Sequence, residues 1–352
     1  MKKIISLILA MLTAVALLAG CTQEPVEIDI GLPFPTAETV NEMISNMGDV
    51  TDKASAAYVI EIIEEYNSLD AISQSKIVDI EKVYETAKNS SEYFEQDTNL
   101  RAMSFNLRSG ELEPERVQNV VETIRREEPD VIGFQEGTGT MCFEILRQLG
   151  DKYEMMAHYK YGGKSEENDA IAYNKQKFTL IDHDTLWLTE TPEYKTKHPD
   201  TSWYRIFVYQ VLERKSDGQR FIHVNTHLDF IGDHICEYQV SNLTTHLDIV
   251  YGDTFPIVIT GDFNTGINSP AYKVMLERGY EDTGLYGERT RTYHGYREEG
   301  GGVIDFIFVN DNLPILSYKV CDEKINGTWV SDHNPIVADL MLFPTSESLK
   351  AE

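Results

Sequence analysis

A short apolar run that ends in a glycine, a carboxylate and a carboxamide constrains the fold of this chain most. Residues 256–260 are a proline and four β-branched residues, and Gly261, Asp262 and Asn264 follow closely. Such a run is typical of a buried strand that opens into a loop. Ligands bind at the carboxyl ends of strands in α/β folds, so Asp262 and Asn264 are candidates to hold a metal ion or a phosphate. A simple turn uses the same residue types and is the alternative.

The length of the chain allows a full hydrophobic core, and its charge limits its partners. The 352 residues are 41% hydrophobic, which is enough for one large domain with an appendage. With 31 basic and 58 acidic residues, the net charge of −27 argues against a general affinity for nucleic acid or anionic lipid. A polyanionic substrate would have to be met by local positive charges or by metal ions.

Residues 1–20 have the layout of a secretory signal. Lys2 and Lys3 precede an apolar run that is too short to be a convincing transmembrane anchor. The ending Leu18-Ala19-Gly20-Cys21 resembles a bacterial lipoprotein signal, in which the cysteine receives the lipid and becomes the mature N-terminus. This resemblance predicts a lipid anchor at Cys21, on the extracytoplasmic face of the cell membrane. An ordinary secretory signal with an incidental cysteine is the alternative.

Two further segments precede the main part of the chain. Residues 21–35 are polar and contain three prolines, which suits a tether. Residues 36–90 carry apolar side chains at spacings of three and four, which predicts three amphipathic helices joined by short loops. The segment resembles the small three-helix modules of bacterial surface proteins. None of its residues calls for chemistry, so we expect it to act as a spacer.

Strands and helices are interspersed from residue 99 to residue 343. Strands are expected at 100–105, 130–134, 168–173, 178–188, 203–213, 221–228, 256–260, 303–309, 315–321 and 336–340. Helices are expected at 114–128, 138–149 and 233–250. This mixed order favours a layered α/β sandwich over a barrel of strict strand–helix repeats.

Three cysteines remain after the predicted signal, namely Cys142, Cys236 and Cys321. They lack the Cys-x-x-Cys spacing of a zinc site, and their number does not suit a disulfide framework. An odd count in an exported protein permits one disulfide, but buried free thiols fit the apolar context better.

Polar side chains recur at the ends of the expected strands. Asn106 ends the first strand, Glu136 directly follows the second, and His227 lies near the end of the strand at 221–228. Each of these residues taken singly has a plain structural explanation. Their recurrence together with Asp262 indicates one site at the carboxyl end of a sheet.

Asp305 is an anomaly in its sequence context. It lies within residues 303–309, whose two alternating faces are both apolar. A carboxylate in a strand buried on both sides is costly unless a partner meets it, and Asp332-His333 offers one. A buried aspartate that holds a histidine ring nitrogen sets the tautomer and stabilises the imidazolium during proton transfer. A structural ion pair that closes the sheet is the alternative.

Six short motifs follow one another along the chain. They are Met103-Ser104-Phe105-Asn106, Phe134-Gln135-Glu136, Asn225-Thr226-His227-Leu228-Asp229, Gly261-Asp262-Phe263-Asn264, Ile304-Asp305-Phe306-Ile307-Phe308 and Ser331-Asp332-His333-Asn334-Pro335. This ordered set resembles the endonuclease/exonuclease/phosphatase superfamily, which includes DNase I, exonuclease III and neutral sphingomyelinases. The resemblance covers residues 99–343 and implies a catalytic domain built as a four-layer α/β/β/α sandwich. Residues 187–192 and 291–296 look most like a secreted bacterial branch and the deadenylase-like enzymes.

The resemblance implies a hydrolase that uses a divalent cation. Glu136, with Asn106 and Asp332, would supply oxygen ligands that suit Mg²⁺ or Mn²⁺. Phosphoester hydrolysis needs such a cation to neutralise the non-bridging oxygens of the phosphoryl group.

The same resemblance implies roles for the other motif residues. Asp262 would orient or activate the attacking water, and Asn264 and His227 would hold the phosphoryl oxygens. His333, oriented by Asp305, would contact the phosphate or act as the base. Members of the superfamily exchange these roles among the motif residues. The membership of the site is therefore predicted more firmly than the role of each residue.

Two further residues are expected to bind substrate. Arg205 would contact the phosphate, although the tryptophan–aspartate pair expected before it is only partly present as Asp200 and Trp203. A surface arginine is the alternative reading of Arg205. His294 belongs to the stretch at 291–296 that resembles the family and is expected to lie near the substrate.

These observations together predict a surface-anchored, monomeric, metal-dependent phosphoesterase that acts on a phosphodiester or a phosphomonoester. One alternative is a secreted-side nuclease acting on DNA or RNA, which the acidic charge balance disfavours. The other is a non-catalytic surface binding protein that keeps the sandwich. The intact set of glutamate, aspartate, asparagine and histidine residues argues against a decayed site.

Overall fold

The computed structural model describes residues 35–94, 98–110, 113–159, 167–201, 203–252 and 255–350. The predicted signal, Cys21 and all but the end of the predicted tether lie outside these ranges. Within them, no helix is both long and apolar enough to cross a membrane.

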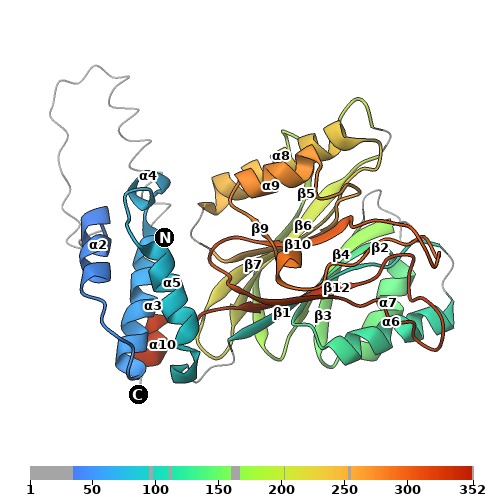
Figure 1. Cartoon of the computed structure of the whole chain (residues 1–352). Helices are drawn as coiled ribbons and strands as arrows, with labels where there is room; N and C mark the ends of the chain where they lie inside the picture. Colours follow the sequence, from blue (N-terminus) through green and yellow to red (C-terminus); the bar gives the residue numbers. More distant parts are fainter. Residues whose placement is uncertain are drawn as a thin grey trace. The chain divides into compact units, whose positions relative to one another are not determined.

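The strands of the described residues form two six-stranded sheets that pack face to face (Figure 1). The first sheet has the order β11 (Ile315–Val320), β12 (Ile336–Met341), β1 (Asn99–Asn106), β2 (Val131–Thr138), β4 (Glu167–Asn174) and β3 (Tyr153–Tyr159). The second has the order β5 (Phe178–Trp187), β6 (Ile206–Arg214), β7 (Arg220–His227), β8 (Ile257–Asp262), β10 (Asp305–Val309) and β9 (Glu281–Asp282). Side chains such as Leu100, Phe178 and Ile307 fill the space between the sheets.

Helices cover the outer face of each sheet (Figure 1). On the first sheet these are α6 (Pro114–Glu127) and α7 (Gly139–Leu149), and on the second they are α8 (Asp233–Val250) and α9 (Pro270–Glu277). Both α6 and α9 begin at a proline, whose fixed φ suits the first helical position. The predicted α/β/β/α sandwich is therefore confirmed.

Each sheet contains one parallel pair of strands, and these pairs define where a site can form. The pair β1–β2 is joined through α6, and the pair β7–β8 through α8, as parallel strands require. At their carboxyl ends Asn106 lies opposite Gln135, and His227 lies opposite Asp262. The antiparallel strand β10 then places Asp305 opposite Asp262. The fold thus gathers the polar strand ends at one edge.

Most predicted elements are present, with some corrections. The strand expected at 203–213 begins only at Ile206, and the strand expected at 303–309 begins at Asp305. Glu136 does not follow β2 but lies inside it, beside an irregularity in the pairing with β4. Several short or edge elements were not predicted. They are β3, β9, α9, α10 (Ser346–Lys350) and the 3₁₀ segments Ser91–Tyr93 and Thr283–Tyr286.

The helices expected at 36–90 are α2 (Ala37–Ser45), α3 (Lys53–Ser68) and α5 (Ile80–Asn89), together with the short α4 (Ala71–Gln74). Side-chain oxygens of Thr36 and Asp52 cap the first two. Their apolar faces share one cluster with Met341, Phe343 and Leu349, which follow or end the sandwich. Residues from Pro35 onward accordingly belong to one compact unit.

Cys142, Cys236 and Cys321 are buried and form no disulfide among the described residues, as the sequence predicted. Burial raises the pKa of the Cys236 and Cys321 thiols to about 12, so these groups are inert toward oxidation and metals at neutral pH.

Candidate active site

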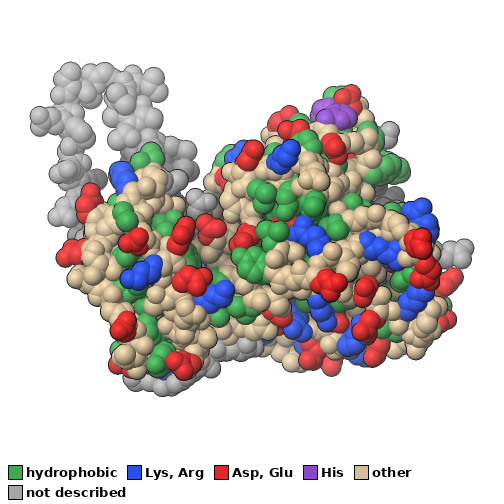
Figure 2. Space-filling model, viewed as in Figure 1, with side chains coloured by type: hydrophobic (Ala, Val, Ile, Leu, Met, Phe, Trp, Pro, Cys, Tyr) green, Lys and Arg blue, Asp and Glu red, His purple; other side chains and the backbone are tan. Residues whose placement is uncertain are grey.

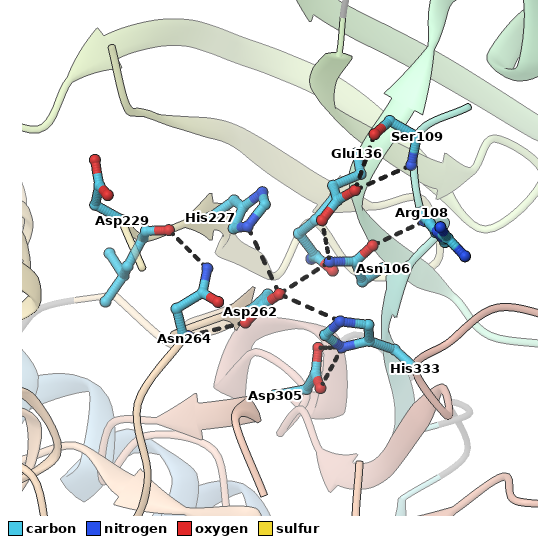
Figure 3. A network of polar contacts seen from close by, with 12 residues as sticks. Asn106, Arg108, Ser109, Glu136, His227, Asp229, Asp262, Asn264, Asp305 and His333 are labelled. Atoms are coloured by element: carbon cyan, nitrogen blue, oxygen red, sulfur yellow. Dashed lines mark hydrogen bonds and ion pairs between the residues drawn. The ribbon is translucent and has the colours of Figure 1, made fainter. Parts of the chain in front are cut away.

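Most of the predicted site residues meet at the carboxyl ends of β1, β2, β7 and β8 and at the start of β10 (Figure 3). The residues drawn together there are Asn106, Glu136, His227, Asp262, Asn264, Asp305 and His333. They come from both sheets, because the sheets pack with these edges together. Side chains from both sheets could therefore contact a reacting group bound here.

Glu136 has an unusual backbone conformation that aims its carboxylate. Its φ is 58°, in the left-handed region that side chains other than glycine rarely adopt. The strand pairing shifts at this point between Phe134 and Gly137, as in a β-bulge, and bulges next to active sites redirect side chains. The Glu136 carboxylate accepts hydrogen bonds from Ser109 N at 3.0 Å and Ser109 Oγ at 3.2 Å. Strain of about 1–3 kcal/mol is kept only where the surroundings impose it, and such positions cluster at active sites.

The carboxylate of Glu136 is held in its charged form. Burial by itself would raise its pKa, but hydrogen bonds from Ser109 and Asn106 and the charge of His333 outweigh burial and lower the pKa. An ionised, partly buried carboxylate is the group that a divalent cation selects.

Asn106 bridges the two carboxylates of the site. Its Nδ2 donates to Glu136 Oε1 at 3.2 Å and to Asp262 Oδ2 at 2.9 Å. Its Oδ1 accepts from the backbone N–H of Arg108 at 2.8 Å. The structure therefore presents the amide nitrogen of Asn106 to the carboxylates, whereas the role expected from the sequence was that of an oxygen ligand.

Asp262 is buried at the centre of the site. Its Oδ2 accepts the hydrogen bond from Asn106, and the Nε2 atoms of His227 and His333 approach the same oxygen at 3.6 and 3.7 Å. Burial raises the pKa of Asp262, and the negative charge of Asp305 raises it further. A carboxyl group with a raised pKa is a stronger proton acceptor than an ordinary aspartate when it is ionised.

Asp305 and His333 form the pair that the sequence predicted. His333 Nδ1 lies 2.9 Å from Asp305 Oδ2, and both residues are buried. Burial alone would lower the pKa of His333, but the charges of Asp305 and Asp262 outweigh it and raise the pKa to about 10. The raised pKa favours the charged imidazolium, and its Nε2 lies 3.7 Å from Asp262 Oδ2.

The donor set suits a divalent cation. Among the described residues, Glu136, His227 and Asp262 can each offer one ligand atom, and these atoms lie within 4.8 Å of one another. Asp262, Asp305 and His333 form a second such group. The carboxylate oxygens of these groups are ligands that Mg²⁺ or Mn²⁺ accept. The site thus has acidic and histidine groups that could hold a metal.

The remaining predicted residues lie around this centre. Asn264, at φ 51°, donates its backbone N–H to Asp262 Oδ1 at 2.9 Å and its Nδ2 to Leu228 O at 2.9 Å. Asp332 belongs to neither metal-type group among the described residues, and its Oδ2 lies 3.9 Å from Arg108 Nε.

Arg205 and His294 are both buried. Arg205 is therefore not a surface arginine, which was the alternative reading of this residue. The Nε atom of Arg205 has no hydrogen-bond partner among the described residues, and neither does His294 Nε2. Burial and the charge of Arg291 lower the pKa of His294 to about 4, so this ring is neutral. Its Nδ1 accepts from the backbone N–H of Tyr296 at 3.0 Å. Its ring lies 4.7 Å from that of Trp329, and its backbone N–H donates to Asp332 O at 3.0 Å.

A buried polar layer behind the site was missed in the sequence. Gln135 Nε2 donates to Asn225 Oδ1 at 2.7 Å, and Asn225 Nδ2 donates to Phe134 O at 2.8 Å, so the two sheets are linked directly behind Glu136. Gly133 permits this close approach, because a Cβ atom there would lie 2.0 Å from Thr260 Oγ1. Gln135, a polar residue next to Glu136 in an otherwise apolar strand, was the sequence signal that could have revealed this layer.

Comparisons with known proteins agree with this geometry. The model of the Endonuclease/Exonuclease/phosphatase family matches residues 103–333. A solved endonuclease/exonuclease/phosphatase from Bacteroides vulgatus is 26% identical, with a TM-score of 0.64 over 70% of this chain and 100% of that chain. A mannosyl-6-phosphatase from Bacteroides thetaiotaomicron is 22% identical, with a TM-score of 0.62 over 69% and 99% of the two chains. The human Nocturnin catalytic domain, solved with sulfate, is 19% identical, with a TM-score of 0.58 over 70% and 94%. No curated protein sequence matches the chain.

Proposed function

Because this chain belongs to the endonuclease/exonuclease/phosphatase family, we propose that it hydrolyses a phosphoester with the help of a divalent metal ion, Mg²⁺ or Mn²⁺. The observation that carries the proposal is the environment of Asp262. A buried carboxylate with a raised pKa is approached by one amide and two imidazole nitrogens, next to a second, ionised carboxylate. This combination supplies a proton acceptor, positive charge and a cation site within one small volume.

Glu136 is the main candidate to hold the ion, because its carboxylate is ionised and partly buried at the site. A bound divalent cation neutralises the non-bridging oxygens of the phosphoryl group. Asn106 keeps the two carboxylates at a fixed separation through its amide nitrogen. Asp332 would act from the rim, beside Arg108.

Asp262 is proposed to orient the attacking water and to take its proton. Its buried position and raised pKa suit a base that works near neutral pH. The charged His333, held by Asp305, would direct its Nε2 proton toward the phosphoryl oxygens, where negative charge builds up. Asn264 and His227 flank the same space and would contact these oxygens (Figure 3).

The charge of the protein favours a small substrate over a polymer of phosphates. The net charge is −27, and on the face shown in Figure 2 the acidic side chains are interspersed with basic ones. The similar mannosyl-6-phosphatase acts on a sugar phosphate, according to its name. A small phosphate ester is therefore the favoured substrate class.

We also propose that the protein is a monomer anchored by lipid on Cys21, at the extracytoplasmic face of the cell membrane. The support is the sequence ending Leu18-Ala19-Gly20-Cys21 and the polar, proline-containing residues that follow it. The helices α2 to α5 would then act as a spacer between the membrane and the sandwich.

A panel of phosphoesters tests the proposed activity. The protein would be incubated with Mg²⁺ or Mn²⁺ and sugar phosphates, nucleotides, inositol phosphates, sphingomyelin, RNA or plasmid DNA, and released phosphate or cleaved product measured. We expect turnover of a small ester that EDTA abolishes and that an Asp262→Asn variant lacks. Preferred cleavage of RNA or DNA would make the nuclease alternative correct. Absence of turnover on every substrate would support the non-catalytic alternative.

A further inference from the structure

Arg108 lies at the rim of the site and has no role in the proposed mechanism so far. Its side chain is 46% exposed, and its Nε is 3.9 Å from Asp332 Oδ2. Its guanidinium lies over the ring of Tyr296, with Cζ 5.0 Å from the ring centroid. Figure 3 shows Arg108 on the side of the site formed by Asn106 and Glu136.

The backbone of Arg108 is held in a costly conformation. Its φ is 52°, in the left-handed region, which costs of order 1–3 kcal/mol for a residue with a Cβ. Its N–H donates to Asn106 Oδ1 at 2.8 Å, and its carbonyl accepts from Arg116 Nη1 at 2.9 Å. Arg116 Nη1 also donates to Leu107 O at 2.8 Å.

The same loop ties Arg108 to the candidate metal ligand. The next residue, Ser109, donates both its backbone N–H and its hydroxyl to Glu136. The backbone of Arg108 is therefore fixed next to a residue that binds the Glu136 carboxylate. A hydrogen bond to Tyr296 and the charges of Asp332 and Glu136 raise the pKa of the Arg108 guanidinium, so this group lies near both carboxylates.

The guanidinium is not locked in a tight ion pair. Arg101 shows what such a pair looks like, with Nε and Nη2 at 2.7 and 2.9 Å from the two oxygens of Asp339. The contact of Arg108 with Asp332 is longer, at 3.9 Å, and involves one nitrogen. Tyr296 holds the guanidinium through its ring and through a side-chain hydrogen bond, and the other N–H donors of the planar fork are left for a ligand.

We propose that Arg108 is a specificity-determining residue that binds the terminal oxygens of a phosphomonoester dianion, with Tyr296 holding the guanidinium in place. A monoester offers three terminal oxygens and two negative charges near neutral pH, whereas a diester offers two oxygens and one charge. The planar fork of arginine can contact two terminal oxygens at once, and its positive charge favours the dianion over the singly charged diester. This inference rests on the proposed phosphoester hydrolysis and narrows its substrate to monoesters.

Binding and kinetics of matched variants test the inference. The full chain, Arg108→Gln and Arg108→Lys would be titrated with inorganic phosphate and with dimethyl phosphate by calorimetry in the presence of Mg²⁺. Hydrolysis of p-nitrophenyl phosphate and bis(p-nitrophenyl) phosphate would be measured on the same samples. Arg220→Gln is the control, because Arg220 is 48% exposed and pairs with Glu213 at the opposite end of β7.

We expect Arg108→Gln to weaken phosphate binding about 10–100-fold, the loss typical of a charge-assisted hydrogen bond, and to change dimethyl phosphate binding little. KM for the monoester should rise with kcat nearly kept, and Arg108→Lys should restore part of the loss. Arg220→Gln should match the parent. Unchanged phosphate binding in Arg108→Gln, equal losses for both ligands, or a parent that binds no phosphate would each overturn the inference.

The two proposals fail in different ways. A parent that binds phosphate through Arg108 but hydrolyses neither these two esters nor any phosphoester of the panel would end the proposed function and leave the binding role intact. A parent that hydrolyses both esters, with a monoester-to-diester preference that Arg108→Gln leaves unchanged, would keep the function and remove the role of Arg108.

Discussion

The carboxylate of Asp305 holds the imidazole of His333 at Nδ1, with its two oxygens at 2.9 and 3.1 Å. Asp305 begins β10 of the second sheet, and His333 lies just before β12 of the first. The pair therefore joins the two sheets at the site. Because Nδ1 is occupied, the ring presents Nε2 to Asp262, at 3.7 Å.

Removing the imidazole should be far more harmful than removing the charge that orients it. We expect His333→Ala to lower kcat/KM by about 10²–10⁴-fold, and no Mg²⁺ concentration should restore it. Asp305→Asn should cause a smaller loss, because asparagine keeps a hydrogen-bonding group but loses the charge that favours the imidazolium. Both variants are assayed across a Mg²⁺ titration.

The exposed His183 on β5 supplies the control for these variants, and His183→Ala should match the parent. Parental activity of His333→Ala on a phosphoester would place the reacting groups elsewhere and end the assignment of this site.

Loss of the Glu136 charge should act through the metal. Glu136→Gln keeps the shape of the side chain and its contact with Ser109, so we expect activity to fall and to recover partly at high Mg²⁺. The apparent Mg²⁺ affinity should weaken at least about 10-fold, since second-shell changes alone cost about 10–100-fold. Glu144→Gln on α7, where Glu144 pairs with Arg147, is the control. A loss that high Mg²⁺ leaves untouched contradicts the role of Glu136.

His223 should make the protein less stable in acid. It is buried between Gln210 and Thr260, and burial lowers its pKa to about 3. Between pH 6.5 and about 3 the unfolded chain binds a proton that the folded protein does not, so stability falls as the pH falls, by about 1.4 kcal/mol per pH unit. Urea unfolding at several pH values should show a shallower decline for His223→Gln. An identical decline would mean that other titratable groups determine the loss of stability in acid.

The apolar cluster beneath α3 and α5 should contribute to the stability of the whole unit. Phe343 is 4% exposed in this cluster, so Phe343→Ala should lower the free energy of unfolding by about 3–5 kcal/mol. Leu285 is 66% exposed, and Leu285→Ala should change it by less than about 0.5 kcal/mol. The kcat of folded Phe343→Ala should equal that of the parent. A fall in kcat would link the helices to the site.

The lipid anchor is tested by one substitution outside the described residues. Cys21→Ser removes the thiol that would receive the lipid, so the protein should leave the membrane fraction or remain unprocessed. Fractionation and the mass of the mature N-terminus decide the result. A variant that is processed and membrane-bound like the parent would show the resemblance to a lipoprotein signal to be misleading.

The sequence predicted the layers of the fold well because each main strand is marked by a continuous apolar run. Residues 256–260 and 303–309 show this clearly, and both became buried strands with shifts of one or two residues. The strand β3 was missed because it is an edge strand with mixed polarity, Tyr153–Tyr159. The helix α9 was missed because its eight residues offer little periodicity.

The site could be predicted in its membership but not in its geometry. Asp305 predicted a partner, because a buried carboxylate in an apolar strand needs a hydrogen bond or an opposite charge. His333 is that partner. No sequence pattern shows that Glu136 adopts a left-handed φ or that Asn106 turns its nitrogen toward Asp262. These details depend on how the two sheets meet, which residue types alone do not specify.

The apolar cluster that α3 and α5 share with Met341, Phe343 and Leu349 imposes an order on biosynthesis. A ribosome delivers α2 to α5 long before residues 341–349, so part of the apolar face of these helices stays uncovered while the sandwich is still being made. The helices gain these apolar contacts only when β12 has formed and the residues that follow it have packed against them. Until that moment this uncovered apolar face is a surface that a chaperone can bind.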